Sequence, residues 1–254
     1  MPDFATFDLA GLAPFIAIGF AAQMVDGALG MAFGVIASTL MVSALGVPPA
    51  RASAGVHLVE VFTTAASGIS HVINRNVNWR LFARLVIPGV IGGVAGAYLV
   101  TISGEYARPF VMAYLAVIGI YLLARAFGIP PEHREPKHVA PLGLIGGFLD
   151  AAGGGGWGPV VTSNLLVQGS HPRTTIGTVN TAEFFLTSVI SVTFIITLGL
   201  EAFTVATVGL LIGGVAAAPL GALLVKRVRP QLLLGLVGAV LTLTSAYSLY
   251  RAFA

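Results

Sequence analysis

Four consecutive glycines interrupt an apolar run in the stretch Gly147-Phe-Leu-Asp-Ala-Ala-Gly-Gly-Gly-Gly-Trp-Gly-Pro159. Glycine loses the most backbone entropy on ordering and proline lacks an N–H donor, so this stretch is predicted to break a helix. In lipid, a broken backbone is tolerated only where it is buried in protein or lines a wet cavity. With Asp150 beside it, the break is a candidate binding site. A tight helix contact through small residues is the simpler alternative.

The composition around this stretch indicates an integral membrane protein. The 254 residues are 56% hydrophobic and only 9% charged, with a mean hydropathy of +0.93. Soluble domains carry about 25% charged residues. Because the net charge of +3 belongs to a membrane chain, its basic residues are expected to set topology rather than to bind nucleic acid. The chain has no cysteine, which excludes disulfide and thiol chemistry.

Two of the hydrophobic stretches are too long for a single span of about 20 residues. The stretches run roughly over 10–45, 52–73, 81–102, 107–127, 139–168, 174–198, 202–225 and 231–250. The first and fifth each contain a break, at 26–34 and 150–159. We predict that each of these two folds as a hairpin, made of two half-helices or two short spans, within a single membrane transport domain covering 1–254.

The two halves of the chain repeat each other. Asp26 precedes Gly34 by the same spacing as Asp150 precedes Gly158, and Ile91-Gly-Gly-Val-Ala-Gly-Ala97 recurs as Ile212-Gly-Gly-Val-Ala-Ala-Ala218. This indicates an internal duplication, with repeat 1 at about 10–127 and repeat 2 at about 139–253. The Ile-Gly-Gly segments are small-residue ridges of the kind that pack helices together.

The hairpin model gives the basic residues a strong asymmetry between the two sides of the membrane. With single crossings, tracing the loops divides the 13 Lys and Arg residues six to seven, whereas with hairpins the division is ten to three. The minority are Arg51, Arg108 and Arg251. By the positive-inside rule, the side with ten is cytoplasmic and both termini are periplasmic. Each repeat then crosses an odd net number of times, so the repeats are inverted, as in many secondary transporters.

Four acids lie inside predicted membrane segments and form two symmetric pairs: Asp26 with Glu60, and Asp150 with Glu183. A carboxylate at that depth costs several kcal/mol unless it is protonated or partnered, which makes these acids functional candidates. The glutamates are candidate proton carriers; a structural hydrogen-bonded pair is the alternative. Asp26 and Asp150 can instead cap the half-helix that follows each break.

Further polar residues share the helices of the two glutamates. His57 lies on the face of Glu60 and is a candidate proton partner, or else only a hydrogen-bonding group between helices. Asn180 occupies the corresponding place beside Glu183. Arg51 and Arg173 begin these helices, where a helix N-terminus and a guanidinium attract anions. Snorkelling of each arginine to the interface is the competing interpretation.

The duplicated pattern resembles the sulfite exporter TauE/SafE family. The resemblance rests on the glycine-rich break Asp150–Pro159, on helices carrying Ala54-Gly55 and Ile176-Gly177-Thr178, and on the Ile-Gly-Gly ridges. It covers essentially the whole chain, although the first break, 27–34, has fewer glycines. The resemblance implies export or uptake of small sulfur-containing anions, such as sulfite or organosulfonates, across the bacterial inner membrane.

We therefore expect an all-α polytopic membrane protein with two inverted repeats, each a glycine-rich broken hairpin plus three spanning helices. It would move a small sulfur-containing anion between the two breaks, coupled to protons. The expected substrate-binding residues are Gly153, Gly154, Gly155, Gly156, Trp157, Gly30, Gly34, Asn164, Thr178, Asn180, Arg51 and Arg173. The expected proton-coupling residues are Glu60, Glu183, His57, Asp26 and Asp150.

Other functions compete with proton-coupled anion transport. A passive anion channel and a metal or cation transporter fit the same fold. An intramembrane metal enzyme would use His57, Glu60, Asp26, Asp150 and Glu183 as ligands. The sequence lacks G-x-x-x-x-G-K-[ST], H-E-x-x-H and G-x-S-x-G, so we expect neither ATP hydrolysis nor another enzyme activity, and no cofactor or metal. The expected partners are the small anion, the lipid bilayer and a second copy in a homodimer.

Overall fold

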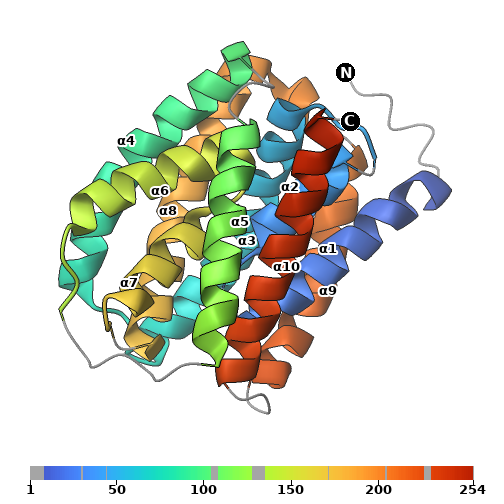
Figure 1. The fold of residues 1–254 in the computed structure, drawn as a ribbon. Coiled ribbons are helices and arrows are strands. Elements are labelled where there is room, and N and C mark those ends of the chain that lie inside the picture. The colour runs from blue at the N-terminus through green and yellow to red at the C-terminus, as the bar shows by residue number, and fades with distance from the viewer. Residues whose placement is uncertain are drawn as a thin grey trace.

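The computed structural model describes residues 9–29, 31–43, 45–103, 108–127, 135–170, 172–203, 205–225 and 230–253, and within these ranges it contains helices and no strands (Figure 1). The helices are α1 (Leu9–Leu29), α2 (Phe33–Ser43), α3 (Pro49–Ile73), α4 (Trp79–Ser103), α5 (Arg108–Ala126), α6 (Val139–Gly153), α7 (Ser163–Val167), α8 (Pro172–Leu198), α9 (Val205–Val225) and α10 (Pro230–Phe253). A π-helical turn, Gly158–Thr162, leads into α7, and a short 3-10 helix, Leu200–Ala202, precedes α9.

The described helices carry the apolar surface of a multi-pass membrane protein. Three of them, in α3, α4 and α8, are long and apolar enough to cross a bilayer. Shorter apolar helical segments lie in α1, α2, α6 and α9. Large apolar side chains on the outer surface remain exposed, among them Ile87, Ile91 and Ile102 on α4. Such a surface is suited to lipid contact.

Both predicted helix breaks are present. In the first half α1 ends at Leu29 and α2 begins at Phe33. In the second half α6 ends at Gly153, and the π-helical turn begins at Gly158. Gly154 and Gly155 adopt φ values of +75° and +125°, which favour glycine over other residues. The glycine run therefore ends α6 and reverses the chain.

The second broken stretch returns to the end of the bundle from which it starts. The backbone N–H of Lys137, just before α6, donates to Oε1 of Gln168, just after α7, at 2.7 Å. At the same end, the N–H of Asn78 donates to Oγ1 of Thr178 at 2.8 Å. We call this the Asn78 end. Figure 1 shows α7 running back toward the lower left, where the connection to α8 lies.

The small-residue ridges pack pairs of helices at backbone distance, as predicted. A Cβ built on Gly92 of α4 would lie 1.9 Å from the carbonyl oxygen of Leu144 on α6. On the other pair, a Cβ on Gly213 of α9 would lie 2.1 Å from the carbonyl oxygen of Ile16 on α1. Only residues without a Cβ allow this approach. Each broken stretch is thereby held against the fourth helix of the opposite half.

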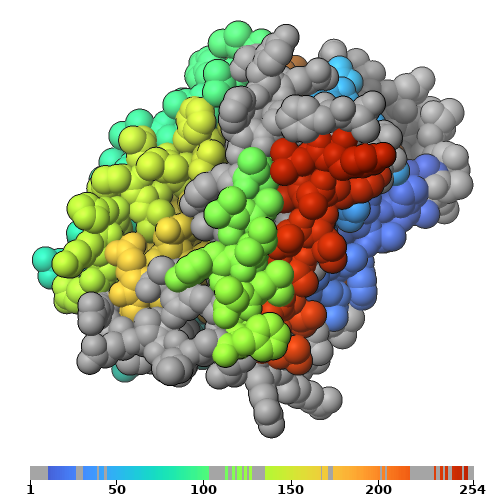
Figure 2. All heavy atoms as spheres, in the orientation of Figure 1, coloured from blue at the N-terminus to red at the C-terminus, as the bar shows by residue number. Residues whose placement is uncertain are grey.

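Two further helix pairs also join the halves. Asn180 of α8 donates to Ser67 of α3 at 3.1 Å, where these helices cross inside the bundle. In Figure 2, α5 and α10 run side by side on the face toward the viewer. A Cβ on Gly119 of α5 would lie 2.5 Å from Oγ1 of Thr242 on α10, so this pair is also closely packed.

Candidate functional site

The two helix breaks touch each other. A Cβ built on Gly34 would lie 2.5 Å from the Cα of Gly155, and one on Gly155 would lie 2.2 Å from the Cα of Gly34. Gly154 packs against Ser38 of α2 in the same way, at 2.7 Å from its Cβ. The glycines of both breaks therefore bring two interrupted backbones together inside the protein, at the place where the sequence predicts a substrate.

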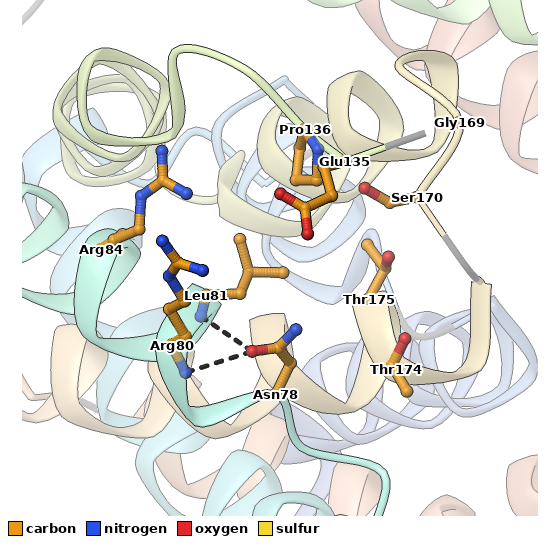
Figure 3. A pocket seen from close by; sticks show the side chains of 10 residues that line it. All are labelled: Asn78, Arg80, Leu81, Arg84, Glu135, Pro136, Gly169, Ser170, Thr174 and Thr175. Atoms are coloured by element: carbon orange, nitrogen blue, oxygen red, sulfur yellow. Dashed lines mark hydrogen bonds between the residues drawn. The ribbon is translucent and has the colours of Figure 1, made fainter. Parts of the chain in front are cut away.

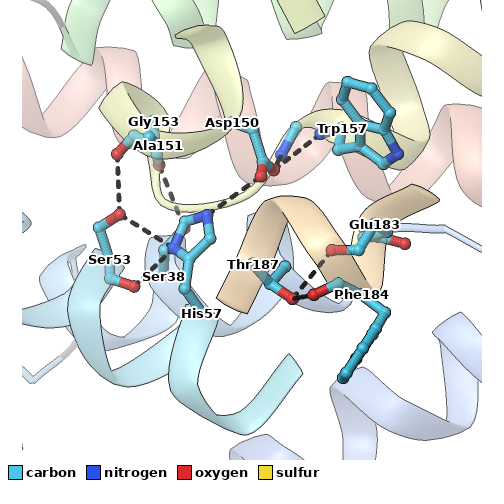
Figure 4. Close-up of polar contacts among 11 residues, drawn as sticks. Ser38, Ser53, His57, Asp150, Ala151, Gly153, Trp157, Glu183, Phe184 and Thr187 are labelled. Atoms are coloured by element: carbon cyan, nitrogen blue, oxygen red, sulfur yellow. Dashed lines mark hydrogen bonds and ion pairs between the residues drawn. The ribbon is translucent and has the colours of Figure 1, made fainter. Parts of the chain in front are cut away.

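Asp150 holds the second break (Figure 4). Its Oδ1 accepts the backbone N–H groups of Gly156 at 2.6 Å and Trp157 at 2.8 Å. These amides begin the helical segment after the break and have no intrahelical acceptor of their own. A buried carboxylate of the protein thus occupies the position at a helix N-terminus where an anion binds most readily.

Asp26 repeats this arrangement in the first half. Its Oδ1 accepts the backbone N–H of Phe33 at 3.3 Å, across the same seven-residue spacing that separates Asp150 from Trp157. Both aspartates therefore act at least as caps, which is one of the two roles considered from the sequence. The longer distance shows a weaker bond at the first break.

His57 joins the second break to α3. Its Nε2 lies 3.1 Å from Oδ2 of Asp150, and both side chains are fully buried. Its Nδ1 lies 2.7 Å from the carbonyl oxygen of Ser53, which only accepts, so Nδ1 carries a proton. A hydrogen bond between Nε2 and Oδ2 then needs a second proton, on the ring or on the carboxyl. The contact between His57 and Asp150 therefore contains one proton, carried by one of the two side chains.

Glu60 lies directly beside the contact between the breaks. Its Oε1 is 2.9 Å from a Cβ built on Gly34, and the backbone N–H of Gly34 donates to this carboxyl group. The other oxygen, Oε2, is buried and has no hydrogen-bond partner among the described residues. A buried carboxyl oxygen without a partner is costly as a charged group, so it favours a proton or a ligand there.

Glu183 of α8 completes the group of acids. It is half-buried, and its backbone carbonyl oxygen accepts a hydrogen bond from the hydroxyl group of Thr187 at 2.9 Å. Glu183 and Glu60 each lie close enough to Asp26 and Asp150 to interact with them electrostatically. The four acids predicted to be functional therefore form one electrostatic group around the breaks. Like charges repel each other, so ionising all four acids together would be costly.

The remaining candidate residues occupy varied positions. The indole of Trp157 is buried, donates to the carbonyl oxygen of Val179 at 3.2 Å and packs on Gly89. Asn164 of α7 donates to the carbonyl oxygen of Val160, in the π-helical turn, at 2.6 Å. Thr178 accepts the backbone N–H of Asn78, and Asn180 donates to Ser67.

The two arginines and Gly30 complete the candidate residues. Arg51 is exposed on the first turn of α3. Gly30 and the side chain of Arg173 lie outside the described residues.

Two serines at this site were not predicted from the sequence. Ser53 Oγ donates to the carbonyl oxygen of Ala151 at 2.8 Å, and Ser38 Oγ to that of Gly153 at 3.4 Å. They satisfy carbonyls at the end of α6 that have no intrahelical donor. Ser53 precedes His57 by four residues and so shares its helix face, which was a usable signal. Ser38 had no such signal.

The described residues do not form a metal-ligand set. No group of three or more His, Asp or Glu side chains among them is arranged to hold a metal ion. The four acids and His57 are instead distributed over two breaks and two helices. This arrangement gives no support to the metal-enzyme alternative.

Interrupted helices packed against each other inside an apolar bundle, with buried acids around the interruption, define a multi-pass membrane protein of the transporter class. The chain belongs to the sulfite exporter TauE/SafE family, whose model matches residues 15–248. It is also 44% identical over 245 residues to the probable membrane transporter protein YtnM of Bacillus subtilis (strain 168), covering 92% of this chain and 81% of that protein. No solved structure matches it.

Proposed function

We propose that the protein is a secondary transporter of the bacterial inner membrane that moves small sulfur-containing anions, of the sulfite or organosulfonate type, coupled to protons. The observation that carries this proposal is the position of the His57–Asp150 pair. The pair shares a proton between Nε2 of His57 and Oδ2 of Asp150. Oδ1 of the same aspartate accepts hydrogen bonds from the two backbone N–H groups at the start of the second half-helix. Proton and anion therefore meet at the same atoms.

The substrate anion competes with Asp150 for these amides. A carboxylate accepts strongly from the N–H groups of Gly156 and Trp157, whereas a protonated carboxyl accepts weakly. When the shared proton sits on Asp150, the amides become available to another anion. The acids nearby would repel that anion unless they also took up protons, so Glu60 and Glu183 are placed to add protons to the transported complex.

The helix packing supports inverted repeats. The pair α1 and α9 corresponds to the pair α6 and α4 if the two halves are exchanged, and both pairs pack in parallel through glycines. The pair of α3 and α8 contains one helix from each half, and so does the pair of α5 and α10. Rocking of one half against the other around the Gly34–Gly155 contact would expose the breaks to each side in turn.

A cation carrier is the rival function, since four acids surround the breaks. A panel of transport measurements on the purified protein in proteoliposomes separates the two. We expect uptake of at least one of sulfite, sulfate, thiosulfate, taurine and sulfoacetate, and acceleration of that uptake by an imposed pH gradient. Uptake of a metal cation with no anion flux would favour the cation carrier, and anion flux that ignores the pH gradient would favour a passive channel.

A further inference from the structure

A cavity of about 350 Å³ opens at the Asn78 end, away from the helix breaks. Its walls come from the start of α4, the residues before α6, the α7–α8 connection and the first turn of α8 (Figure 3). A small oxyanion fits well within this volume. None of the residues that line it belongs to the site described above.

The cavity is positive on one wall. Arg80 and Arg84, one helical turn apart on α4, both line it, and Figure 3 shows their guanidinium groups on the same side. Glu135 is the acid among the lining residues. Two guanidiniums against one carboxylate leave an excess of positive charge. Arginine offers several N–H donors in a fixed geometry that suits oxyanions.

The opposite wall carries hydroxyl groups that have no partner. Oγ1 of Thr175 and Oγ of Ser170 are buried and unpaired among the described residues, with exposed fractions of 1% and 8% for the two residues. Thr175 lies in the first turn of α8, where the helix dipole favours negative charge. A buried hydroxyl without a partner is costly, so a group that accepts from both hydroxyls would be stabilised here.

The other half of the chain does not repeat this chemistry. When the two halves are aligned with an offset of 121 residues, as Ile91 aligns with Ile212, Glu201 corresponds to Arg80 and Val205 to Arg84. The second half therefore has no pair of arginines at the corresponding positions. The basic wall of the cavity is a feature of the first half.

We propose that this cavity is an oxyanion-binding vestibule, in which Arg80, Arg84, Ser170 and Thr175 collect the substrate anion from the Asn78 side before it reaches the breaks. The proposal rests on the proposed function and adds a binding step on one face. The vestibule lowers the half-saturating anion concentration on that face, while the direction of net transport remains set by the gradients.

The test compares sulfite flux into right-side-out and everted membrane vesicles. In the double variant Arg80→Gln/Arg84→Gln, the half-saturating concentration should rise about tenfold on the Asn78 face, with less than a twofold change on the other face. Thr175→Val, which keeps the shape but removes the hydroxyl, should act in the same direction. Arg75→Gln removes a positive charge from the same end outside the cavity and should saturate like the wild type.

Variants that saturate like the wild type on both faces, or that change equally on both, would overturn the vestibule. If the double variant does not fold, Thr175→Val alone decides. Failure of the wild type to carry any sulfur-containing anion would instead overturn the proposed function.

The phosphate of an anionic lipid shares the chemistry of the substrate. We therefore repeat the comparison in vesicles of neutral lipid and of phosphatidylglycerol. The effect of the double variant should persist in neutral lipid. An effect confined to phosphatidylglycerol vesicles would assign the cavity to a lipid headgroup and overturn its role in loading substrate.

Discussion

Gly155 packs backbone against backbone on Gly34, and its φ of +125° lies in the region that disfavours residues with a side chain. This contact joins the two broken stretches of the protein. Neither helix propensity nor simple helix packing requires a run of glycines here. The contact between the breaks does, because it brings two interrupted backbones together among four buried or half-buried acids.

Gly155→Ala should abolish transport. The added methyl group would lie 2.2 Å from the Cα of Gly34 and would force the breaks apart. Gly199→Ala is a matched control, because Gly199 has a φ of +76° but nothing within 4 Å of its added Cβ. The control should lose only about 1–2 kcal/mol of stability from the backbone conformation. We would measure flux at equal amounts of reconstituted protein. Normal flux in Gly155→Ala would return the glycines to a packing role.

Asp150→Ala should destabilise the protein more than Asp26→Ala. Two buried N–H groups lose their acceptor in the first variant, at about 1–3 kcal/mol each. The bond described for Asp26 is a single one at 3.3 Å. In thermal unfolding in detergent, the Tm of Asp150→Ala should lie roughly 5–10 °C below the Tm of Asp26→Ala. Equal losses in the two variants would mean that the breaks are equivalent, against the asymmetry of their hydrogen bonds.

Glu183→Gln should uncouple transport from protons. Glutamine keeps the shape and hydrogen bonding of the glutamate but cannot release a proton. The variant should still exchange substrate across the vesicle membrane, yet lose its acceleration by a pH gradient. Glu60→Gln should do the same only if the halves share the task. If both variants keep full pH-driven transport, the glutamates are structural.

Reporter fusions test the topology. We expect a fusion at Ala254 to report the periplasm and one at Arg134 to report the cytoplasm, from the ten-to-three division of basic residues. The contact between Lys137 and Gln168 agrees with a stretch that returns to its starting end. A cytoplasmic C-terminus would contradict the predicted sidedness of the protein.

The sequence was enough to locate both breaks and the packing ridges, because glycine runs and small-residue spacing are local signals. It was not enough to pair His57 with Asp150, since 93 residues separate them and several acids were available as partners. The sequence offered capping by Asp150 as one of two roles but did not decide between them, and it did not show that the capped amides are those of Gly156 and Trp157. The vestibule was missed for a similar reason: Arg80 and Ser170 are far apart in the sequence and line one cavity only in the tertiary structure.

Simultaneous recording of anion flux and internal pH tests the central claim, that anion and proton move together through the breaks. An organosulfonate is the suitable anion, because it does not itself exchange protons in the neutral range as sulfite does. In sealed proteoliposomes without a starting pH gradient, we predict that a gradient of this anion alone changes the internal pH in proportion to its flux, and that Glu183→Gln carries the anion without the pH change. Anion flux through the wild-type protein with no change in internal pH would contradict the account.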